Sequence, residues 1–455
     1  MIFYVAMTQP SMLWAKWSKF RHSFWFLPLC LNLIAIVMGV TIPYVESFFR
    51  LGRIDSLDWM LSTADSARSI LGAIAGALIT ETTMIFSVTM VSLSLTASQY
   101  GSQPLRTFMT RGISQLTLGM FLGTSMYCLI VLFWVQDGEN VTFVPHASVV
   151  VALVLTVVNH LLFIYFLDQI ATSLQSNVVV KTIADDLAAT IDRLYPSQVG
   201  QKGKEVRKNL KPLSELVDGL ESMPHQLTIM GPGAGFIQIV DTRSLMKLAC
   251  RDDLVIRLLM WPGDFLCDQK EIAVIYSQSK LDHDEMTEHL HRAMILGSRR
   301  TPDQDVESAV WELVEVAVRA LSPGINDPIT ALICIDYMGV SLRRLAGSLP
   351  VDERRVDDEG HLRLLIPSVS FKHVLRTAFG QIQLYGRENG LILERLLDQL
   401  KLILPACHSE EHRQVVSHHA ELIGQIAEAN VQQPQIVEKI RQQVDALQEL
   451  SNQVD

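Results

Sequence analysis

Cysteine is scarce in this sequence, and its distribution argues against a disulfide framework. The 455 residues include six cysteines, and no two of them form a CxxC pair. Cys30 and Cys128 lie inside strongly apolar runs, and the other four lie in the more polar remainder. This usage is typical of small buried side chains in a reducing compartment and excludes a scaffold built on disulfides.

Motifs of catalysis and cofactor binding are also lacking. The sequence contains no nucleophile elbow, Walker loop, dinucleotide fingerprint or kinase motif set. Histidines cluster in residues 281–293 without the HExxH spacing of a zinc site, so we interpret this stretch as a solvated helix face. We therefore expect no enzyme activity, no cofactor and no metal centre.

Basic charge is in deficit, with a formal net charge of −10 at pH 7. Through Asp168 the sequence has eight basic and eight acidic residues, so the whole net charge belongs to the remainder. An acidic C-terminal region argues against nucleic acid as a partner.

Charge of either sign is almost missing from four long apolar runs near the N-terminus. They cover residues 24–45, 69–99, 113–135 and 144–167, and the second contains one charged residue, Glu81. About 20 apolar residues cross a bilayer, so each run is long enough to span it. The first run is of span length and no small-residue cleavage site follows it, so we expect it to remain as an anchor.

Basic residues near the ends of these runs predict the orientation of the chain. Lys16, Lys19 and Arg21 precede the first run, Arg106 and Arg111 lie between the second and third, and the loop after the third has no base. By the positive-inside rule both termini are then cytoplasmic, although Arg50, Arg53 and Arg68 in the first outer loop count against this.

The second run has two polar faces when drawn as a helix of about 100° per residue. One face holds only small or hydroxyl side chains: Gly72, Gly76, Thr80, Thr83, Ser87, Ser94 and Ser98. Gly72 and Gly76 form a GxxxG motif, as do Gly119 and Gly123 in the third run, and such motifs let helices approach closely in lipid. We expect this face to pack within the bundle; the alternative is that it lines a polar pathway.

Glu81 lies on the second polar face, with Ser92 and, beyond it, Thr89 and Thr96. A carboxylate at bilayer depth is costly and usually faces a bundle interior, a partner or water. Possible partners are Asn159 and His160 in the fourth run and Asn32 in the first, with His160 expected to be a hydrogen-bonded interior histidine rather than a proton relay. Two polar faces on one helix predict a homo-oligomer or an internal aqueous cavity, with Glu81 protonated or paired.

The sequence after the fourth run divides into three parts. Residues 171–226 combine an amphipathic helix with a linker, residues 227–280 contain short strand-like runs typical of a small β-rich module, and residues 281–455 are mainly helical. With residues 1–170 as the transmembrane domain, the predicted fold is a four-span α-helical bundle followed by a cytoplasmic α+β domain dominated by helices.

Residues 301–328 predict a helical hairpin. Thr301 and Gln304 have the spacing of a capping box with Pro302 at the first helical position, which predicts a helix from Pro302 to Leu321. The Ser-Pro-Gly sequence 322–324 ends it, and Asp327 before Pro328 starts the second helix.

The same hairpin contains candidate ligands. Asp303, Asp305, Asn326 and Asp327 offer oxygen atoms for a hard cation, and Arg299 and Arg300 could hold an anion. A helix of about 20 residues, roughly 30 Å long, separates the two sets, so they could share a site only across an oligomer interface. Helix capping explains Thr301 and Asp327 fully, and Asp303 in part, without any ligand.

Several motifs in order resemble one family. They are ARSILGAIAGALI, FSVTMVSLSLTASQYGSQPLRTFM, LGMFLGTSMYCLIVL, GFIQIVD, WPGDF, RRTPDQD and RALSPGINDPITA. The region from Trp25 to at least Arg344 closely resembles the uncharacterised bacterial membrane-protein family known as domain of unknown function 2254. The resemblance implies a multi-span protein of the bacterial inner membrane with a cytoplasmic domain, and it implies no biochemical activity.

The favoured functional hypothesis is an oligomeric ion channel or transport pathway in the bilayer, carrying an ion or small solute past the polar second span. The alternative is a non-conducting sensor or scaffold that signals through its cytoplasmic domain. A membrane-tethered enzyme ranks third because no catalytic motif is present.

Overall fold

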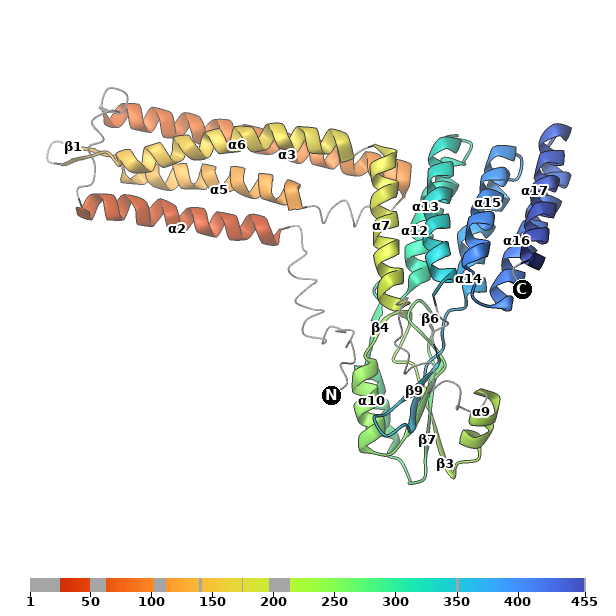
Figure 1. Cartoon of the computed structure of the whole chain (residues 1–455). Coiled ribbons are helices and arrows are strands. Elements are labelled where there is room, and N and C mark those ends of the chain that lie inside the picture. Colours follow the sequence, from red (N-terminus) through yellow and green to blue (C-terminus); the bar gives the residue numbers. More distant parts are fainter. Residues whose placement is uncertain are drawn as a thin grey trace. The chain divides into compact units, whose positions relative to one another are not determined.

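The computed structural model describes residues 25–49, 63–101, 112–138, 141–173, 175–195, 213–348 and 352–453. They belong to two compact units, which we call the membrane unit, Pro10–Val179, and the C-terminal unit, Val180–Asp455 (Figure 1). The basic residues behind the predicted orientation at positions 16–21, 50, 53, 106 and 111, and most of the linker before residue 213, lie outside the described residues.

The membrane unit contains four long helices, as the apolar runs predict. They are α2 (Phe26–Phe49), α3 (Ala64–Tyr100), α5 (Gly112–Trp134) and α6 (His146–Ser173), with a two-stranded hairpin, β1 (Gln136–Gly138) and β2 (Val141–Phe143), between α5 and α6. All four are long and apolar enough to cross a membrane. The 37 residues of α3 correspond to about 55 Å, more than the ~30 Å hydrocarbon core requires.

Helix α5 forms the centre of this bundle and packs against the other three helices. Its Phe121, Tyr127 and Cys128 are fully buried. On the side facing α2, a Cβ at Gly119 would lie 2.8 Å from the Cα of Pro28. The absence of a side chain at Gly119 therefore lets the two backbones come into contact, as small residues do in membrane bundles.

A buried carboxylate joins α2 to the start of α6. Glu46, 4% exposed, accepts hydrogen bonds from the backbone N–H of Ala147 at 2.8 Å and from the hydroxyl of Ser148 at 3.0 Å. The first turn of a helix has unpaired N–H groups and partial positive charge, so the carboxylate is stabilised there.

The C-terminal unit begins with α7 (Ser176–Leu194), most of which belongs to it, and α9 (Leu213–Glu221), and then forms two sheets. The five-stranded sheet has the order β3-β7-β5-β10-β9 and the three-stranded sheet β6-β4-β8. Their strands are β3 (His225–Met230), β4 (Gly235–Val240), β5 (Val255–Leu258), β6 (Phe265–Leu266), β7 (Glu271–Ser277), β8 (Met294–Gly297), β9 (Arg354–Val356) and β10 (Leu362–Leu365), with α10 (Thr242–Arg251) and α11 (His283–Arg292) between strands.

This arrangement extends the β-rich module beyond the predicted boundaries of 227–280. Strand β10 pairs in parallel with β5, and β8 pairs with β4. Leu364 of β10 is fully buried in the same apolar cluster as Ile256 and Ile275. Short strands far along the chain complete the sheets because burying their apolar side chains there is favourable. Local sequence periodicity does not indicate which distant strands pair in this way.

The remaining helices form three antiparallel hairpins. They are α12 (Val306–Ala320) with α13 (Pro328–Ala346), α14 (Phe371–Tyr385) with α15 (Gly390–Ile403), and α16 (Glu410–Asn430) with α17 (Pro434–Gln453). Helices α13, α15 and α17 pack in one row, and α12, α14 and α16 form a second row beside it (Figure 1). The hairpin predicted from a helix at residues 302–321 and a second helix starting at Asp327 is thus the first of three.

Candidate functional site

The strongest candidate site is a pair of polar side chains in the middle of two membrane helices. Nε2 of His160, on α6, lies 3.4 Å from Oε1 of Glu81, on α3. His160 also contacts the backbone carbonyl oxygen of Thr156 through Nδ1 at 2.9 Å. A carbonyl oxygen can only accept, so Nδ1 carries a hydrogen and, in the neutral ring, Nε2 has a lone pair facing Glu81. A hydrogen bond between His160 and Glu81 then requires one additional proton, on either partner.

Further polar atoms of the same two helices are buried without being used by the fold. Oε2 of Glu81 and both side-chain amide atoms of Asn159 have no hydrogen-bond partner among the residues that the structure describes. Asn159 is fully buried. Each unsatisfied buried polar group costs about 1–3 kcal/mol. These atoms of Glu81 and Asn159 therefore remain able to form hydrogen bonds that the described chain does not supply.

The two polar faces of α3 have opposite environments. On the Glu81 face, Thr89, Ser92 and Thr96 are buried, and the two threonine hydroxyls bond to carbonyls of their own helix. Every residue of the small-residue face is exposed: Gly72, Gly76, Thr80, Thr83, Ser87, Ser94 and Ser98.

This exposure corrects the expectation that the small-residue face packs within the bundle. No neighbouring atom of the described chain lies within 4 Å of where a Cβ would stand on Gly72 or Gly76, whereas Gly119 and Gly123 both meet α2. The expectation that His160 is an interior residue is also wrong, since its side chain is 54% exposed. Asn32 bonds to the carbonyl of Pro28 on its own helix.

In the C-terminal unit, the RRTPDQD segment forms a charged cluster with residues from elsewhere. Arg300 donates to both carboxylate oxygens of Asp305, at 2.7 and 2.9 Å, and to Glu307 at 2.9 Å. His373 on α14 lies 3.0 Å from the other oxygen of Glu307. The two carboxylates are almost completely buried, and burial raises the pKa of Asp305 above its ordinary value.

The WPGDF segment packs directly on this cluster. A Cβ at Gly263 would lie 2.6 Å from Oδ2 of Asp305 and 2.8 Å from Nη2 of Arg300. Gly263 has φ +104, which glycine adopts without strain. Sequence reasoning missed Gly263, Glu307 and His373 as members of this cluster. Only Glu307 had a sequence signal, because it follows the RRTPDQD segment by two residues.

The GFIQIVD segment also bonds to the RRTPDQD segment, and α12 starts later in the chain than the sequence predicts. Gln304 accepts from the N–H of Val240 at 3.0 Å and donates to its carbonyl at 3.2 Å, so its side chain is not available to cap at Thr301. Helix α12 begins at Val306 instead of Pro302, with Asp305 accepting from the amides of Glu307 and Ser308 as N-cap. The predicted capping box is therefore wrong.

The other predicted ligands do not join this cluster. Arg299 and Asp303 are exposed, and the hydroxyl of Thr301 is buried without a hydrogen-bond partner in the described chain. Asp327 caps α13 through the N–H of Thr330 at 3.1 Å, and Asn326 adopts φ 50 in the elbow. The 15 residues of α12 hold the elbow roughly 22 Å from the Arg300 cluster.

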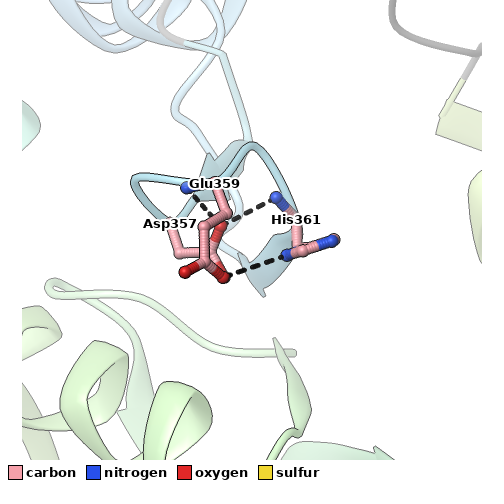
Figure 2. Close-up of side chains that lie close together, drawn as sticks. All are labelled: Asp357, Glu359 and His361. Atoms are coloured by element: carbon pink, nitrogen blue, oxygen red, sulfur yellow. Dashed lines mark hydrogen bonds and ion pairs between the residues drawn. The ribbon is translucent and has the colours of Figure 1, made fainter.

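A third group of polar side chains lies at the turn between β9 and β10. Asp357, Glu359 and His361 offer potential metal-ligand atoms within 4.8 Å of one another, and Figure 2 shows them around the turn. The Asp357 carboxylate accepts from the backbone N–H of Glu359 and His361 and from Arg363 Nε at 2.7 Å. The turn and Arg363 therefore account for this cluster without a metal ion.

Four apolar helices of spanning length, with interior polar groups, define a multi-pass integral membrane protein. The chain belongs to the family described as predicted membrane protein (DUF2254), which matches residues 21–401. It is similar to uncharacterized proteins of Mycobacterium bovis and Mycobacterium tuberculosis, each 26% identical over 370 residues that cover 80% of this chain and 69% of the relative. No solved structure matches the chain.

Proposed function

We propose that this protein is a homo-oligomeric ion-transport pathway in the bacterial inner membrane, with Glu81, His160 and Asn159 as its polar groups. The observation that carries the proposal is the Glu81–His160 contact, 3.4 Å between Nε2 and Oε1 in the middle of two apolar helices. Ionisable side chains at bilayer depth are costly and characteristically mark ion or proton pathways. A carboxylate favours a cation, and the histidine tautomer leaves this pair ready to share a proton.

The unsatisfied atoms of Asn159 and Glu81 support the same proposal. A moving cation or water chain would supply the hydrogen bonds or coordination that Asn159 and Glu81 Oε2 lack. In a purely structural bundle these positions would gain stability from apolar side chains of similar size.

The exposed small-residue face of α3 supports an assembly of several copies. It presents Gly72 and Gly76 with no neighbour in the described chain, and a GxxxG face in lipid gains van der Waals contacts when a second helix packs on it. The hydroxyls of Thr80 and Thr83 bond to carbonyls of their own helix, so they can enter such an interface without new partners.

Flux through liposomes containing the purified full-length chain tests the pathway. We expect cation or proton flux that Glu81→Gln lowers at least about tenfold. The matched control is Asp65→Asn, which removes an acid from the exposed first turn of the same helix and should leave the flux within about twofold. Absence of flux for the unaltered protein with H⁺, Na⁺ and K⁺ gradients between about pH 5 and pH 8 would reject the proposal.

One observation favours the alternative, a non-conducting sensor. Helix α7 starts three residues after α6 ends and is attached to the C-terminal unit through Asp192 to Arg344 at 3.3 Å and Arg193 to the carbonyl of Pro302 at 2.9 Å. Helix α7 therefore connects the last membrane helix to this unit along the chain. Hydrogen-exchange protection of α7 and α12 that changes with membrane composition, in a protein without flux, would support the sensor.

A further inference from the structure

The third helical hairpin, α16 with α17, lies at one end of the row of three, which we call the hairpin array (Figure 1). It packs on the second hairpin, with α16 against α14 and α15 and with α17 against α15. The polar contacts between α17 and α15 lie at the surface, as in the bond of 2.5 Å from Lys439 to Glu394. A terminal unit of such an array can separate from its neighbour while the other units stay folded.

His419 lies in this interface, at a position where the other inward-facing residues are apolar. The buried residues of α16 are Val415, Val416, His419, Ala420, Ile423 and Ala427. His419 is 6% exposed, and its Nδ1 is buried without a hydrogen-bond partner in the described part of the chain. In the protonated ring both nitrogens carry a hydrogen, so Nδ1 would then be a charged donor without an acceptor, which is costly.

His412 lies seven residues earlier on the same face of α16. Its ring packs on Phe371 of α14 with centroids 4.6 Å apart, and its Nδ1 is likewise buried without a partner among the described residues. A hydrogen bond to the backbone of Ala346 and the charge of Glu411 favour a proton on this ring, and His408 opposes it. Burial outweighs them and lowers the pKa of His412.

The charged groups around His419 do not compensate for its burial. They are Arg376 on α14 and His418 on α16, and both repel the protonated ring. Among the described residues, α15 and α17 bring no charged group to the ring of His419 or of His412. Burial, followed by the repulsion from His418 and Arg376, lowers the pKa of His419 to about 4.

We infer that residues 410–453 form an acid-released element: the third hairpin leaves the second as a unit when His412 and His419 take up protons. The release uncovers Phe371, on which the His412 ring packs in the docked state. It is a conformational response to acid within the C-terminal unit, and it does not depend on ion transport.

The direction of this response follows from the two states of His419. In the released hairpin the ring has an ordinary histidine pKa near 6.5. Between pH 6.5 and pH 4 the released hairpin therefore binds a proton that the docked hairpin does not, so release becomes more favourable as the pH falls. From His419 alone, the equilibrium constant for release at pH 5 should be about thirtyfold its value at pH 7.5.

Hydrogen exchange of the full-length protein in detergent, read by mass spectrometry, tests the release. Protection factors are corrected for the pH dependence of the intrinsic exchange rate. Between pH 7.5 and pH 5, the amides of α16 and α17 should together lose about thirtyfold in protection. The amides of α12 and α13 should change by less than about threefold. An equal loss in both hairpins would show that the whole unit is destabilised, and it would overturn the inference.

Variants separate His419 from other acid-sensitive groups. His419→Gln should retain most of the protection of α16 and α17 at pH 5, whereas the matched control His418→Gln, at the exposed neighbouring position, should still lose it. Arg376→Gln alters an exposed side chain, so we expect it to fold. Because it removes a cation that repels the protonated ring, it should reduce the loss. A loss of unaltered size in both His419→Gln and Arg376→Gln would overturn the inference.

Discussion

His160 and Glu81 form a pair that can be hydrogen-bonded only with one additional proton, since the Nδ1 hydrogen of His160 is directed at the Thr156 carbonyl and Nε2 faces the carboxylate. The pair lies midway along two apolar helices, with the His160 side chain 54% exposed.

Infrared difference spectroscopy of the reconstituted protein should detect this proton. We expect a carboxylic-acid carbonyl band that Glu81→Gln abolishes and that Asp65→Asn leaves in place. An unaltered band in Glu81→Gln would assign the proton to another residue.

Glycines in the two GxxxG motifs should respond differently to leucine. Gly119→Leu introduces a side chain where Pro28 and Leu31 already lie within 2.8 Å of the Cβ position, so we expect a loss of about 1–3 kcal/mol in unfolding free energy. Gly76→Leu meets no neighbour in the described chain and should leave the unfolding temperature of the protomer unchanged.

The same Gly76→Leu variant should nevertheless dissociate the oligomer if a second copy covers this face. Light scattering in detergent measures the mass of the assembly, and thermal unfolding of each variant measures the protomer. An intact oligomer in Gly76→Leu would place the subunit interface elsewhere.

Arg300 should be far more important for stability than its neighbour Arg299. Arg300→Met leaves the buried Asp305 and Glu307 without their shared cation, and uncompensated buried charge is strongly destabilising, here by about 3 kcal/mol. Arg299→Met alters an exposed side chain and should change stability by less than about 0.5 kcal/mol. Chemical denaturation of both variants measures the difference, and equal effects would contradict the assigned role of the cluster.

Protonation of His419 should destabilise the protein in acid. Burial lowers the pKa of His419 to about 4, whereas the unfolded chain has an ordinary histidine pKa near 6.5. Between these values the unfolded state binds the additional proton, so stability falls as the pH drops below about 6.5, by about 3 kcal/mol at pH 4.

The test of this pH dependence compares His419→Gln with His418→Gln, its exposed neighbour. The first should flatten the decrease of unfolding temperature between pH 6.5 and pH 4, and the second should retain most of it. A similar decrease in all three proteins would assign the acid sensitivity to other groups.

The sequence alone determined the four membrane helices and the first elbow of the hairpin array. More than 20 consecutive, predominantly apolar residues have few stable alternatives to a spanning helix, because backbone groups in lipid must be paired within the segment. At the elbow, Asp327 and Pro328 act through bonds to their immediate neighbours, so the local sequence contains the whole signal.

Tertiary structure decided which face of α3 is interior, where α12 begins and which residues surround Arg300. Both faces of α3 are polar, and only packing against α5 and α6 selects the Glu81 face for burial. Likewise Gln304 bonds to Val240, 64 residues earlier, and His373 reaches Glu307 from another hairpin. The energies of such contacts depend on which distant segments meet, and local propensity and periodicity do not encode that choice.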